Sequence, residues 1–457
     1  MPTRAARRRR AVHTARDNAL LFLGASVAVL AVVVALPSLP AAGAEGRRLP
    51  LDDVVLTVFG AFSGTYATLD PGRDLSTFGQ ALTLAAIQIG GFGFMVGATL
   101  VLMILRGLNP ASSLRAGLMI RDGSPALSLS DALDVSRRVL RFILVCEAAG
   151  AVALAAWFSA RMPLREAAWQ GVYYSVASFC NAGFDLTGSG QSIVPYRGSF
   201  ALHAVVFVLV QLGALSWLVF SDVWAARAWG RLRVETRLIL VAHGALLAVG
   251  TAGMLVGEWN GVLRDDGPGA KVLRALFHSA SARSAGYQSV PFGEASDATR
   301  FLFSALMLVG GAPGSTAGGL RLTTLAVLAV AVRSTMAGQR DAQVMGRRIS
   351  PTIVGQSLVI ATLLVGLWFA TTLAVGLTER ANPADLSFTS IAFDAASAVG
   401  SVGLTTGDPA AYSTAGKLVV SLAMLVGKAG PLTVAYALQR RVQVRRYRVP
   451  ETPIHLG

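Results

Sequence analysis

Apolar stretches long enough to cross a lipid bilayer recur along the whole chain, and they limit the possible folds more than any other feature. A helix needs about 20 apolar residues to cross a bilayer core. Hydrophobic residues make up 53% of the 457 residues, whereas charged residues make up only 14%. We therefore predict an all-α integral membrane protein with eight spanning helices. The predicted spans are residues 18–41, 77–105, 139–160, 199–222, 236–257, 299–332, 353–376 and 414–438.

The first of these spans has an alternative interpretation. The arginines from Arg7 to Arg10 precede its apolar run, and Ala42, Gly43 and Ala44 follow it. This order is also typical of a cleaved secretory signal peptide. The apolar run is long for a signal peptide, and the repeat described below needs this helix, so we interpret it as a span.

Basic residues are concentrated in five segments between and beyond the spans. The formal net charge is +15, but no basic stretch is interleaved with aromatic residues, so we expect no nucleic-acid partner. Cytoplasmic segments of membrane proteins are enriched in Lys and Arg. With eight spans all five segments fall on one side, which we predict to be cytoplasmic, with both termini, in the cell membrane. They are the tail 1–17, the loops 106–138, 223–235 and 333–352, and the tail 439–457.

Several classes of site are excluded by what the sequence contains. The two cysteines, Cys146 and Cys180, lie far apart, and no CxxC or histidine cluster offers metal-ligand spacing. No P-loop, GxSxG or HExxH motif occurs, so we expect neither an enzyme nor an organic cofactor. A polytopic membrane enzyme acting on lipid would need paired carboxylates or histidines, and none has convincing spacing.

A second kind of segment lies between the two spans of each pair. These segments are semi-apolar, too short to cross, and end in small residues, so we predict re-entrant pore helices. They are residues 51–64, 165–182, 269–285 and 386–402.

The ends of these segments are copies of one another. Three have small residues, a glycine and a large apolar residue, at Gly183–Phe184, Gly286–Tyr287 and Gly403–Leu404. The first copy has Thr65 before Tyr66. A second glycine motif follows each copy, at Gly90, Gly213, Gly310 and Gly427. Its offset is 25, 30, 24 and 24 residues, which predicts four repeats of helix, pore helix and helix, at 18–105, 139–222, 236–332 and 353–438.

Four such segments around one axis would form a ring of backbone carbonyls within one chain. Carbonyl oxygens replace the hydration shell of an alkali cation without trapping it by a full charge. Pointing successive carbonyls inward needs backbone geometry that glycine tolerates. For a single glycine, close helix packing would be an equally simple explanation, but the fourfold pattern favours a cation filter.

The most specific stretches are IQIGGFGFM at 87–95, NAGF at 181–184, GGAPGSTAGG at 310–319, SVGLTTG at 401–407, AGKL at 415–418 and GKAGPLT at 427–433. Through them the chain resembles the Trk/Ktr/HKT superfamily of potassium transporters, and it is most similar to the bacterial KtrB/TrkH-type membrane subunit. The resemblance implies an ion-binding filter for K⁺, with Arg283 as its support. The implied filter residues are Ser63, Gly64, Thr65, Cys180, Asn181, Ala182, Gly183, Ser284, Ala285, Gly286, Ser401, Val402 and Gly403.

The resemblance also implies an intramembrane loop that gates the pore below the filter. A simple packing kink at Pro313 is the alternative. Lys428 stands where the family usually has an arginine, and it lacks the planar donors of arginine. It either acts at the gate or extends to a membrane interface. The implied gate residues are Gly310, Gly311, Pro313, Gly314, Ser315, Thr316, Gly318, Gly319 and Lys428.

The main departure from the family pattern lies in the first repeat. The family has glycine at the position of Thr65, and in plant relatives a hydroxyl side chain there accompanies sodium preference. An alternative alignment uses Gly64 as the filter glycine. We favour Thr65, because Tyr66 then matches the large residues of the other repeats and Asp70 keeps the family's distance.

The resemblance implies passive potassium flux, with a sodium-selective or sodium-coupled transporter as the alternative. It also implies a homodimer in membrane lipid and a cytosolic ring of nucleotide-binding regulatory subunits of the KtrA/TrkA kind. The basic loops fit such an acidic partner or anionic lipid equally well. Asp185, Asp394 and Asp408 either concentrate cations at the pore mouth or act as ordinary capping carboxylates.

Overall fold

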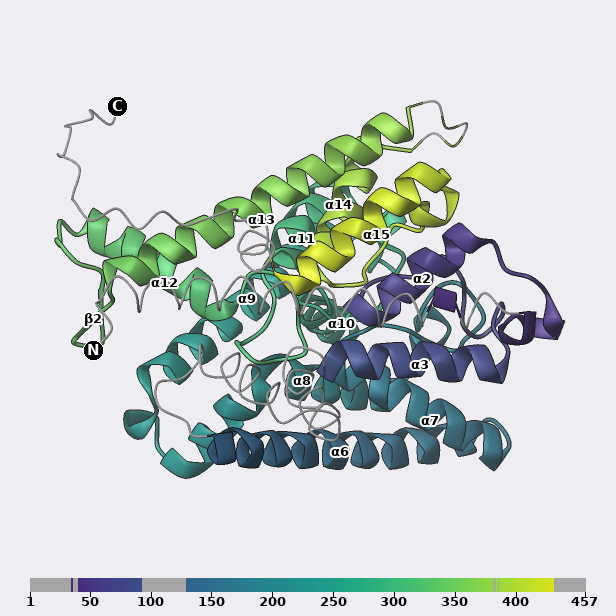
Figure 1. Cartoon of the computed structure of the whole chain (residues 1–457), viewed down its shortest axis with the longest axis horizontal. Helices are drawn as coiled ribbons and strands as arrows, with labels where there is room; N and C mark the ends of the chain where they lie inside the picture. The colour runs from purple at the N-terminus through teal and green to yellow at the C-terminus, as the bar shows by residue number, and fades with distance from the viewer. Residues whose placement is uncertain are drawn as a thin grey trace, which may run out of the picture.

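The computed structural model describes residues 34–35, 40–92, 129–380, 382, 384 and 386–430, and these are mostly helical (Figure 1). Several predicted segments lie outside the described residues. They are most of the span 18–41, the second span beyond residue 92, the last span beyond residue 430, residues 106–128 of the first basic loop, and both basic tails.

Four described helices are long and apolar enough to cross a membrane. Only 22–39% of their most apolar windows is buried inside the protein, so most of that apolar surface faces outward, as contact with lipid requires. They coincide with the predicted spans 139–160, 199–222, 236–257 and 353–376. The helices are α6 (Leu129–Ser159), α8 (Phe200–Ala226), α9 (Val234–Glu258) and α13 (Pro351–Thr378).

Four shorter helices match the predicted re-entrant segments. At 13–16 residues each, they are about 20–24 Å long, less than the roughly 30 Å of a bilayer core. Each begins at a proline or just after a proline or serine and ends in buried, irregular backbone. They are α2 (Leu51–Ser63), α7 (Leu164–Phe179), α10 (Pro268–Ser281) and α14 (Phe388–Gly400), and are called the four short helices below.

The predicted span 299–332 consists of two helices rather than one. Helix α11 (Asp297–Met307) and helix α12 (Leu322–Met336) are separated by irregular backbone, called the 308–321 loop below. This interruption agrees with the expectation that Pro313 and its neighbouring glycines prevent a regular helix. Two further helices, α3 (Thr77–Phe92) and α15 (Thr414–Ala429), begin the predicted spans 77–105 and 414–438.

Each of the four short helices packs against a helix from the neighbouring predicted repeat. Helices α3, α8 and α11 each pack against the short helix that comes next along the chain, namely α7, α10 and α14. Helix α15 packs against α2, the first short helix, beside which it lies in Figure 1. The described helices therefore close a circle with the short helices inside it.

Two features were not predicted. Helix α8 is broken at Ser216, whose φ of 65° and ψ of 152° are not helical. The predicted loop 333–352 contains a small antiparallel hairpin of β1 (Gln343–Val344) and β2 (Arg347–Arg348), so the all-α prediction is wrong there. Met345 and Gly346 both have positive φ, which is the tight turn that a two-residue hairpin loop requires. Short 3₁₀ segments lie at Pro40–Ala42, Ala44–Gly46, Val194–Tyr196, Trp229–Arg231, Phe292–Glu294 and Asp408–Ala411.

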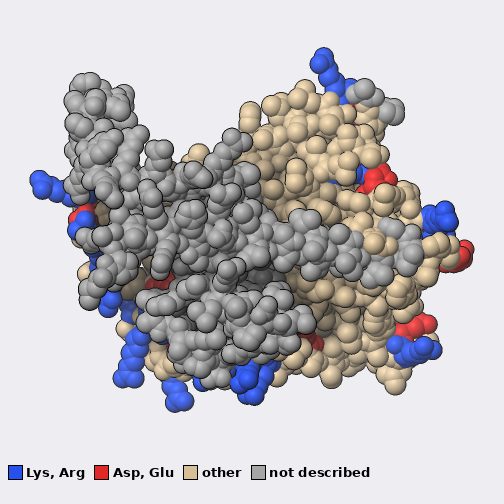
Figure 2. Space-filling model, viewed as in Figure 1, with Lys and Arg blue, Asp and Glu red and all other residues tan. Residues whose placement is uncertain are grey.

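The two ends of the helices define two sides of the molecule. The four short helices begin on one side, called the mouth side below. The hairpin and the α8–α9 connection lie on the other side, called the basic side, where Arg237 contacts the sulfur of Met345. Figure 2 shows visible Lys and Arg side chains mainly around the edges of the described surface, with a broad surface of few charges between them.

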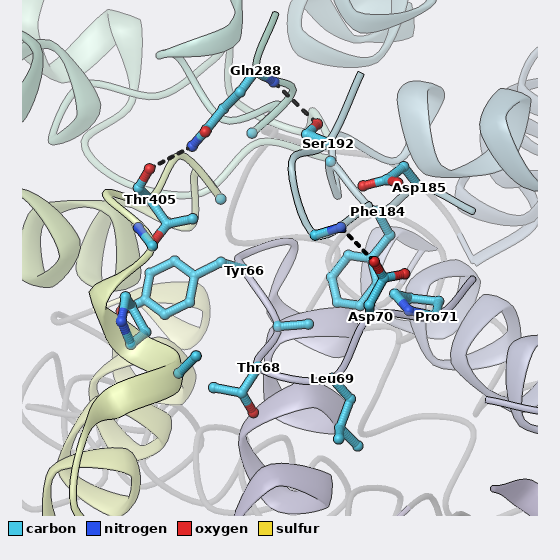
Figure 3. A pocket seen from close by; sticks show the side chains of 18 of the residues that line it. Tyr66, Thr68, Leu69, Asp70, Pro71, Phe184, Asp185, Ser192, Gln288 and Thr405 are labelled. Atoms are coloured by element: carbon cyan, nitrogen blue, oxygen red, sulfur yellow. Dashed lines mark hydrogen bonds between the residues drawn. The ribbon is translucent and has the colours of Figure 1, made fainter. Parts of the chain in front are cut away.

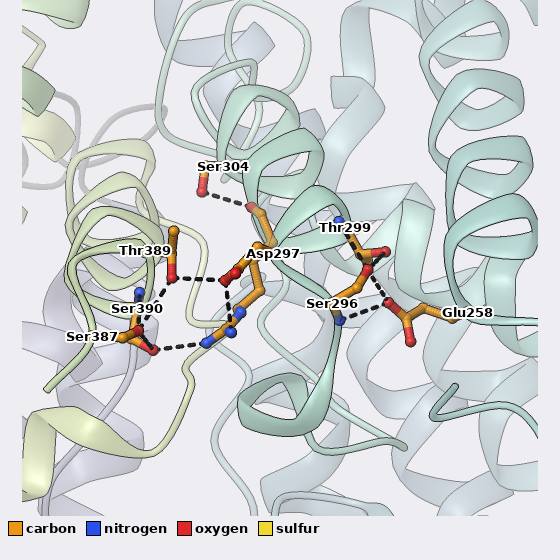
Figure 4. Close-up of polar contacts among 9 residues, drawn as sticks. Glu258, Ser296, Asp297, Thr299, Ser304, Ser387, Thr389 and Ser390 are labelled. Atoms are coloured by element: carbon orange, nitrogen blue, oxygen red, sulfur yellow. Dashed lines mark hydrogen bonds and ion pairs between the residues drawn. The ribbon is translucent and has the colours of Figure 1, made fainter. Parts of the chain in front are cut away.

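Two buried glutamates tie helix ends together on the mouth side in the same way. Glu258, at the end of α9, accepts hydrogen bonds from the backbone N–H and the hydroxyl of Ser296, which caps α11 (Figure 4). Glu379, directly after α13, accepts the same pair of bonds from Ser413, which caps α15. Each carboxylate thereby fixes the start of a later helix: Glu258 that of α11, and Glu379 that of α15.

An ion pair links the last described helix to the first short helix. Nζ of Lys417 lies 3.2 Å from Asp52 and 2.7 Å from Asp53, and the lysine side chain is only 9% exposed. Lys417→Met would leave two carboxylates without their cation, so we expect it to lower the free energy of unfolding by about 1–3 kcal/mol. The apparent melting temperature in detergent measures this effect.

The matched control is Arg264→Met, because the Arg264–Asp265 pair is about three-quarters exposed. An exposed pair contributes little to stability, so this variant should melt like wild type. Equal melting of both variants would show that the Lys417 pair does not hold the two helices together.

Candidate functional site

The segments that follow the four short helices meet one another. They are residues 63–65, 180–183, 284–286 and 401–403, called the convergent segments below. A hypothetical Cβ atom on Gly183 would lie 2.8 Å from Cα of Gly286, and one on Gly286 would lie 2.8 Å from Cα of Gly403. A side chain at either glycine would therefore collide with the backbone of the neighbouring segment.

The first convergent segment completes this circle. A Cβ atom on Gly403 would lie 3.4 Å from the carbonyl carbon of Thr65, and one on Gly64 would lie 2.8 Å from the carbonyl oxygen of Asn181. Each segment touches the next in chain order, and the fourth touches the first. The predicted filter residues are thus brought together, and all of them except the half-buried Gly183 are buried.

Backbone conformation distinguishes the first segment from the other three. Gly183, Gly286 and Gly403 have φ of 69°, 74° and 101°, the left-handed region that glycine adopts without steric cost. Thr65 is not among the described residues with positive φ, whereas Gly64 has φ of 73°. Thr65 therefore occupies the place beside Gly403, while Gly64 has the left-handed backbone.

A cavity of about 230 Å³ opens above the convergent segments on the mouth side (Figure 3). Thr65 and the three glycines line it together, so all four segments face one space. The side chain of Gln288 spans part of its rim, where Nε2 donates to the carbonyl of Thr405 over 2.8 Å. Asp70 and Asp185 add carboxylates to the wall, and Asp70 accepts a 2.7 Å bond from the backbone N–H of Gly190.

Serines near the ends of the short helices hold the convergent segments in place. Ser281 donates to the carbonyl of Tyr287, and Ser397 accepts from the backbone N–H of Gly403. The Ser63 hydroxyl lies 2.9 Å from the hydroxyl of Thr65. Sequence reasoning named Ser63 as a filter residue but counted Ser281 and Ser397 only as small residues. Their recurrence in the last turn of each short helix is the signal that could have found them.

The second glycine motif has the same structural role in three of its four copies. A Cβ atom on Gly90, Gly213 or Gly427 would lie 1.8–2.2 Å from a carbonyl oxygen near the end of a short helix. Those carbonyls belong to Phe62, Phe179 and Val399. Gly310 instead approaches the carbonyl of Gly318 within its own loop. The fixed spacing in the sequence therefore reflects close packing between long and short helices.

The 308–321 loop lies against three convergent segments. The Asn181 amide is 3.0 Å from the hydroxyl of Thr316, and the N–H of Gly318 donates to the hydroxyl of Ser284. Ser284 in turn donates to the carbonyl of Ser401 over 2.7 Å. The predicted gate residues from Gly310 to Gly319 all belong to this loop, so a movement of the loop would alter contacts of the convergent segments.

The break in helix α8 supplies the partners of this loop. Because Ser216 is not helical, the carbonyls one turn earlier are free to bond elsewhere. The carbonyl of Gly213 accepts from the N–H of Thr316, and that of Ala214 accepts from the N–H of Ala312. Two interrupted helices therefore satisfy each other's backbone groups.

Comparison with known families now identifies the chain. The family model TrkH, described as a cation transport protein, matches residues 25–444. The chain belongs to the TrkH family. This confirms the resemblance that the filter and loop motifs indicated.

Among curated relatives of this TrkH-family chain is the potassium/sodium uptake protein NtpJ of Enterococcus hirae, 30% identical over 92% of this chain and 93% of the relative. Another is the Ktr system potassium uptake protein D of Bacillus subtilis, 28% identical over 95% of both chains. The crystal structure of the potassium transporter TrkH from Vibrio parahaemolyticus superposes with a TM-score of 0.64 at 18% identity, covering 90% of this chain and 84% of that one.

Lys428 of this TrkH-family chain is buried rather than extended to an interface. Its Nζ donates to the carbonyl of Thr316 over 2.9 Å, at the centre of the 308–321 loop. Arg321 donates to the carbonyl of Ala317 and to the hydroxyl of Ser315. Two cations thus hold consecutive parts of the loop, and Lys428 makes this bond without the planar donors of arginine.

Arg283, which the resemblance implies as the support of the filter, bonds to a surrounding helix. Among the described residues its bonds go to His243 on helix α9, where Nη1 lies 2.9 Å from Nδ1 and 3.3 Å from the carbonyl oxygen. The side chain of Arg283, directly before the third convergent segment, extends to helix α9. It therefore fastens that segment to the surrounding helix.

The three predicted mouth carboxylates have different surroundings. Asp394 is fully buried and accepts from the N–H and hydroxyl of Thr406, so it holds the chain after the fourth convergent segment rather than facing the cavity. Asp185 lines the cavity and accepts from Thr187. Asp408 begins a 3₁₀ segment.

Gly213→Ala tests the close approach of long and short helices. The added methyl would lie 2.0 Å from the Phe179 carbonyl oxygen, a backbone atom that is unable to move aside cheaply. We expect the variant to lose about 2 kcal/mol or more of stability, seen as lower accumulation in the membrane and earlier thermal aggregation in detergent.

Gly355→Ala is the control, because nothing lies within 4 Å of its added methyl on helix α13. That change should be neutral or slightly stabilising. The close-approach explanation fails if the two alanine variants accumulate and melt alike.

Titration of Asp185 should make cation transport depend on pH at the mouth side. Burial, together with the charge of the neighbouring Asp70, raises the pKa of the Asp185 carboxyl to about 6. Acidification through pH 6 therefore removes a negative charge from the cavity wall. We expect the half-saturating cation concentration to rise between pH 7.5 and 5, measured by tracer uptake into vesicles.

Asp185→Asn should have a raised half-saturating concentration at pH 7.5 and little further change at pH 5. Asp265→Asn, at an exposed position on the same side, should keep the wild-type profile. A wild-type pH profile in Asp185→Asn would assign the titration to another group.

Proposed function

We propose that this chain is the ion-translocating membrane subunit of a potassium uptake system, with passive K⁺ flux through a filter made by the four convergent segments. The observation that carries the proposal is the closed circle of contacts from Gly183 to Gly286, Gly403 and Thr65 above one cavity. The names of the relatives, potassium/sodium uptake protein and Ktr system potassium uptake protein, support the same substrate class.

The chemistry follows from backbone oxygens. A cation leaving the cavity loses water and gains carbonyl ligands from four non-identical segments, which carry no full charge and so release it again. The short helices end beside the convergent segments, and the negative ends of their dipoles favour a cation there. Their N-termini lie on the mouth side, away from the ion path.

The 308–321 loop is the proposed gate. It lies on the side of the convergent segments opposite the cavity, held by Lys428 through Thr316 and by Ser284 through Gly318. In this position the loop and the charge of Lys428 oppose the exit of a cation. Opening requires the loop to leave the carbonyls of the broken helix α8.

The wider architecture is also a proposal. Eight spans in four repeats would place the basic side and both termini in the cytoplasm of a cell-membrane protein. A homodimer with a cytosolic nucleotide-binding regulatory ring is the proposed assembly, and the name of the Ktr-system relatives is consistent with further subunits. The exposed basic residues fit the acidic groups of such a ring or of anionic lipid.

A sodium-selective or sodium-coupled transporter on the same fold is the second candidate. The observation in its favour is Thr65, which brings a hydroxyl to the one convergent segment that lacks the left-handed glycine at this place. The hydroxyl lies 2.9 Å from that of Ser63. This contact between the two hydroxyls restrains the side chain of Thr65 in the first convergent segment.

Flux of K⁺, Rb⁺ and Na⁺ into vesicles that contain the purified protein tests the function directly. We expect K⁺ and Rb⁺ to enter down their gradients without ATP. Thr65→Gly should raise the preference for K⁺ over Na⁺ by about threefold or more, because the first segment would then gain the backbone freedom of the other three.

The control is Thr335→Gly on helix α12, where the hydroxyl bonds only to the carbonyl one turn earlier, away from the convergent segments. It should leave the ion preference unchanged. Flux of Na⁺ without K⁺ would favour the sodium transporter, and absence of any cation flux would refute the proposed function. An unchanged preference in Thr65→Gly would favour the alignment on Gly64.

A further inference from the structure

A buried carboxylate lies beside the second convergent segment, where neither the filter nor the gate accounts for it. Glu147 is in the middle of helix α6, one of the membrane-crossing helices, and is only 6% exposed. An ionisable side chain at such a depth is costly and is rarely kept without a function.

The partners of Glu147 come from two other parts of the chain. The amide nitrogen of Gln88, on helix α3, lies 3.2 and 3.0 Å from its two carboxylate oxygens. The sulfur of Cys180, the first residue of the second convergent segment, lies 3.7 Å from one of those oxygens. The carboxylate therefore joins the outer helices of two repeats to a segment of the proposed filter.

This arrangement suits a charged carboxylate. One amide group serves both oxygens as a donor, and the thiol is a further donor. No ion pair joins Glu147 to a basic side chain in the described part of the chain. When Glu147 is ionised, its negative charge is therefore held by neutral groups, next to the proposed path of a cation.

The contact between Cys180 and this carboxylate is tightly packed. A Cβ atom on Gly91 would lie 2.6 Å from the cysteine sulfur, so the second glycine of the α3 motif leaves room for the thiol. The Cys180 thiol also lies 3.6 Å from the amide oxygen of Gln88. The cysteine is therefore fixed between the carboxylate and the convergent segment of which it is part.

We propose that Glu147 is a positioning residue for cation transport, whose charge raises cation affinity at the second convergent segment. The inference rests on the proposed function, because it needs the convergent segments to bind the ion. Glu147 does not touch the ion itself. It acts across Cys180 through its field and through the position it gives this segment.

Two other buried glutamates show what a purely structural carboxylate looks like in this chain. Glu258 and Glu379 accept bonds from backbone N–H groups and hydroxyls of the serines that cap α11 and α15, and none of these bonds goes to a convergent segment. Within the described ranges, the carboxylate of Glu147 accepts no bond from a helix-capping serine or its backbone N–H. Its helix backbone is instead bonded by Ser175 of the neighbouring short helix, through the carbonyl rather than the carboxylate.

The experiment separates charge from shape. Glu147→Gln keeps the size, removes the charge and replaces one acceptor oxygen with an amide donor, whereas Glu147→Asp keeps the charge on a shorter side chain. We expect Glu147→Gln to raise the half-saturating Rb⁺ concentration about three- to tenfold in vesicle uptake, with a smaller change in maximal rate. Glu147→Asp should lie closer to wild type. Glu258→Gln is the control and should keep the wild-type value.

If Glu147 had only a structural role, Glu147→Gln would change the melting temperature and the amount of protein rather than the half-saturating Rb⁺ concentration. Glu147→Gln with normal melting and a half-saturating concentration within about 1.5-fold of wild type would overturn the inference. If that variant does not accumulate, Gln88→Lys neutralises the same carboxylate by an ion pair and should raise half-saturation in the same direction; no rise there would equally overturn it. Absent wild-type flux would refute the proposed function itself.

Discussion

Backbone polar groups at membrane depth need partners within the protein, and the described structure depends on this constraint. Lipid offers no hydrogen bonds, so irregular backbone survives there only when protein buries it or water reaches it. The four short helices stop inside the molecule and leave exactly such backbone behind. Long helices surround it, serines near the helix ends bond it, and glycines such as Gly213 allow the long helices to approach its carbonyls closely. The cavity at the mouth side is lined by the convergent segments and is large enough for water to enter.

The same constraint explains why two helix interruptions occur together. The 308–321 loop leaves amide groups without helical partners, and the break at Ser216 leaves carbonyls of α8 without theirs. The two sets bond each other at Ala312 and Thr316. Ser216 has a backbone conformation that is essentially restricted to glycine, which costs about 1–3 kcal/mol. The strained conformation of Ser216 persists because the loop and α8 bond each other. If the loop moved away from α8, Ser216 would be free to relax.

The sequence carried enough information for four of the spans, the short helices and the meeting of Gly183, Gly286 and Gly403. Apolar length and repeated glycine spacing report directly on membrane crossing and on close backbone contact. It did not show the break in α8, because Ser216 is neither proline nor glycine and the apolar run continues through it. The direction of Arg283 was also missed, since its partner His243 is 40 residues away and looked like an isolated histidine. Contacts set by tertiary packing leave no local signature.

Charge is distributed unevenly along the proposed ion path, and this distribution gives the path a direction. Asp70 and Asp185 line the cavity on the mouth side, Glu147 lies beside the second convergent segment, and Lys428 with Arg321 hold the loop beyond it. A cation is therefore attracted up to the convergent segments and opposed directly after them. Part of this opposition is the 308–321 loop itself, which is held by hydrogen bonds with α8, Ser284 and Lys428, whereas the carboxylate of Glu147 is fixed on helix α6. In the proposed mechanism, opening breaks loop bonds that also reach Asn181 and Ser284 in the convergent segments, so the gate and the binding region are coupled.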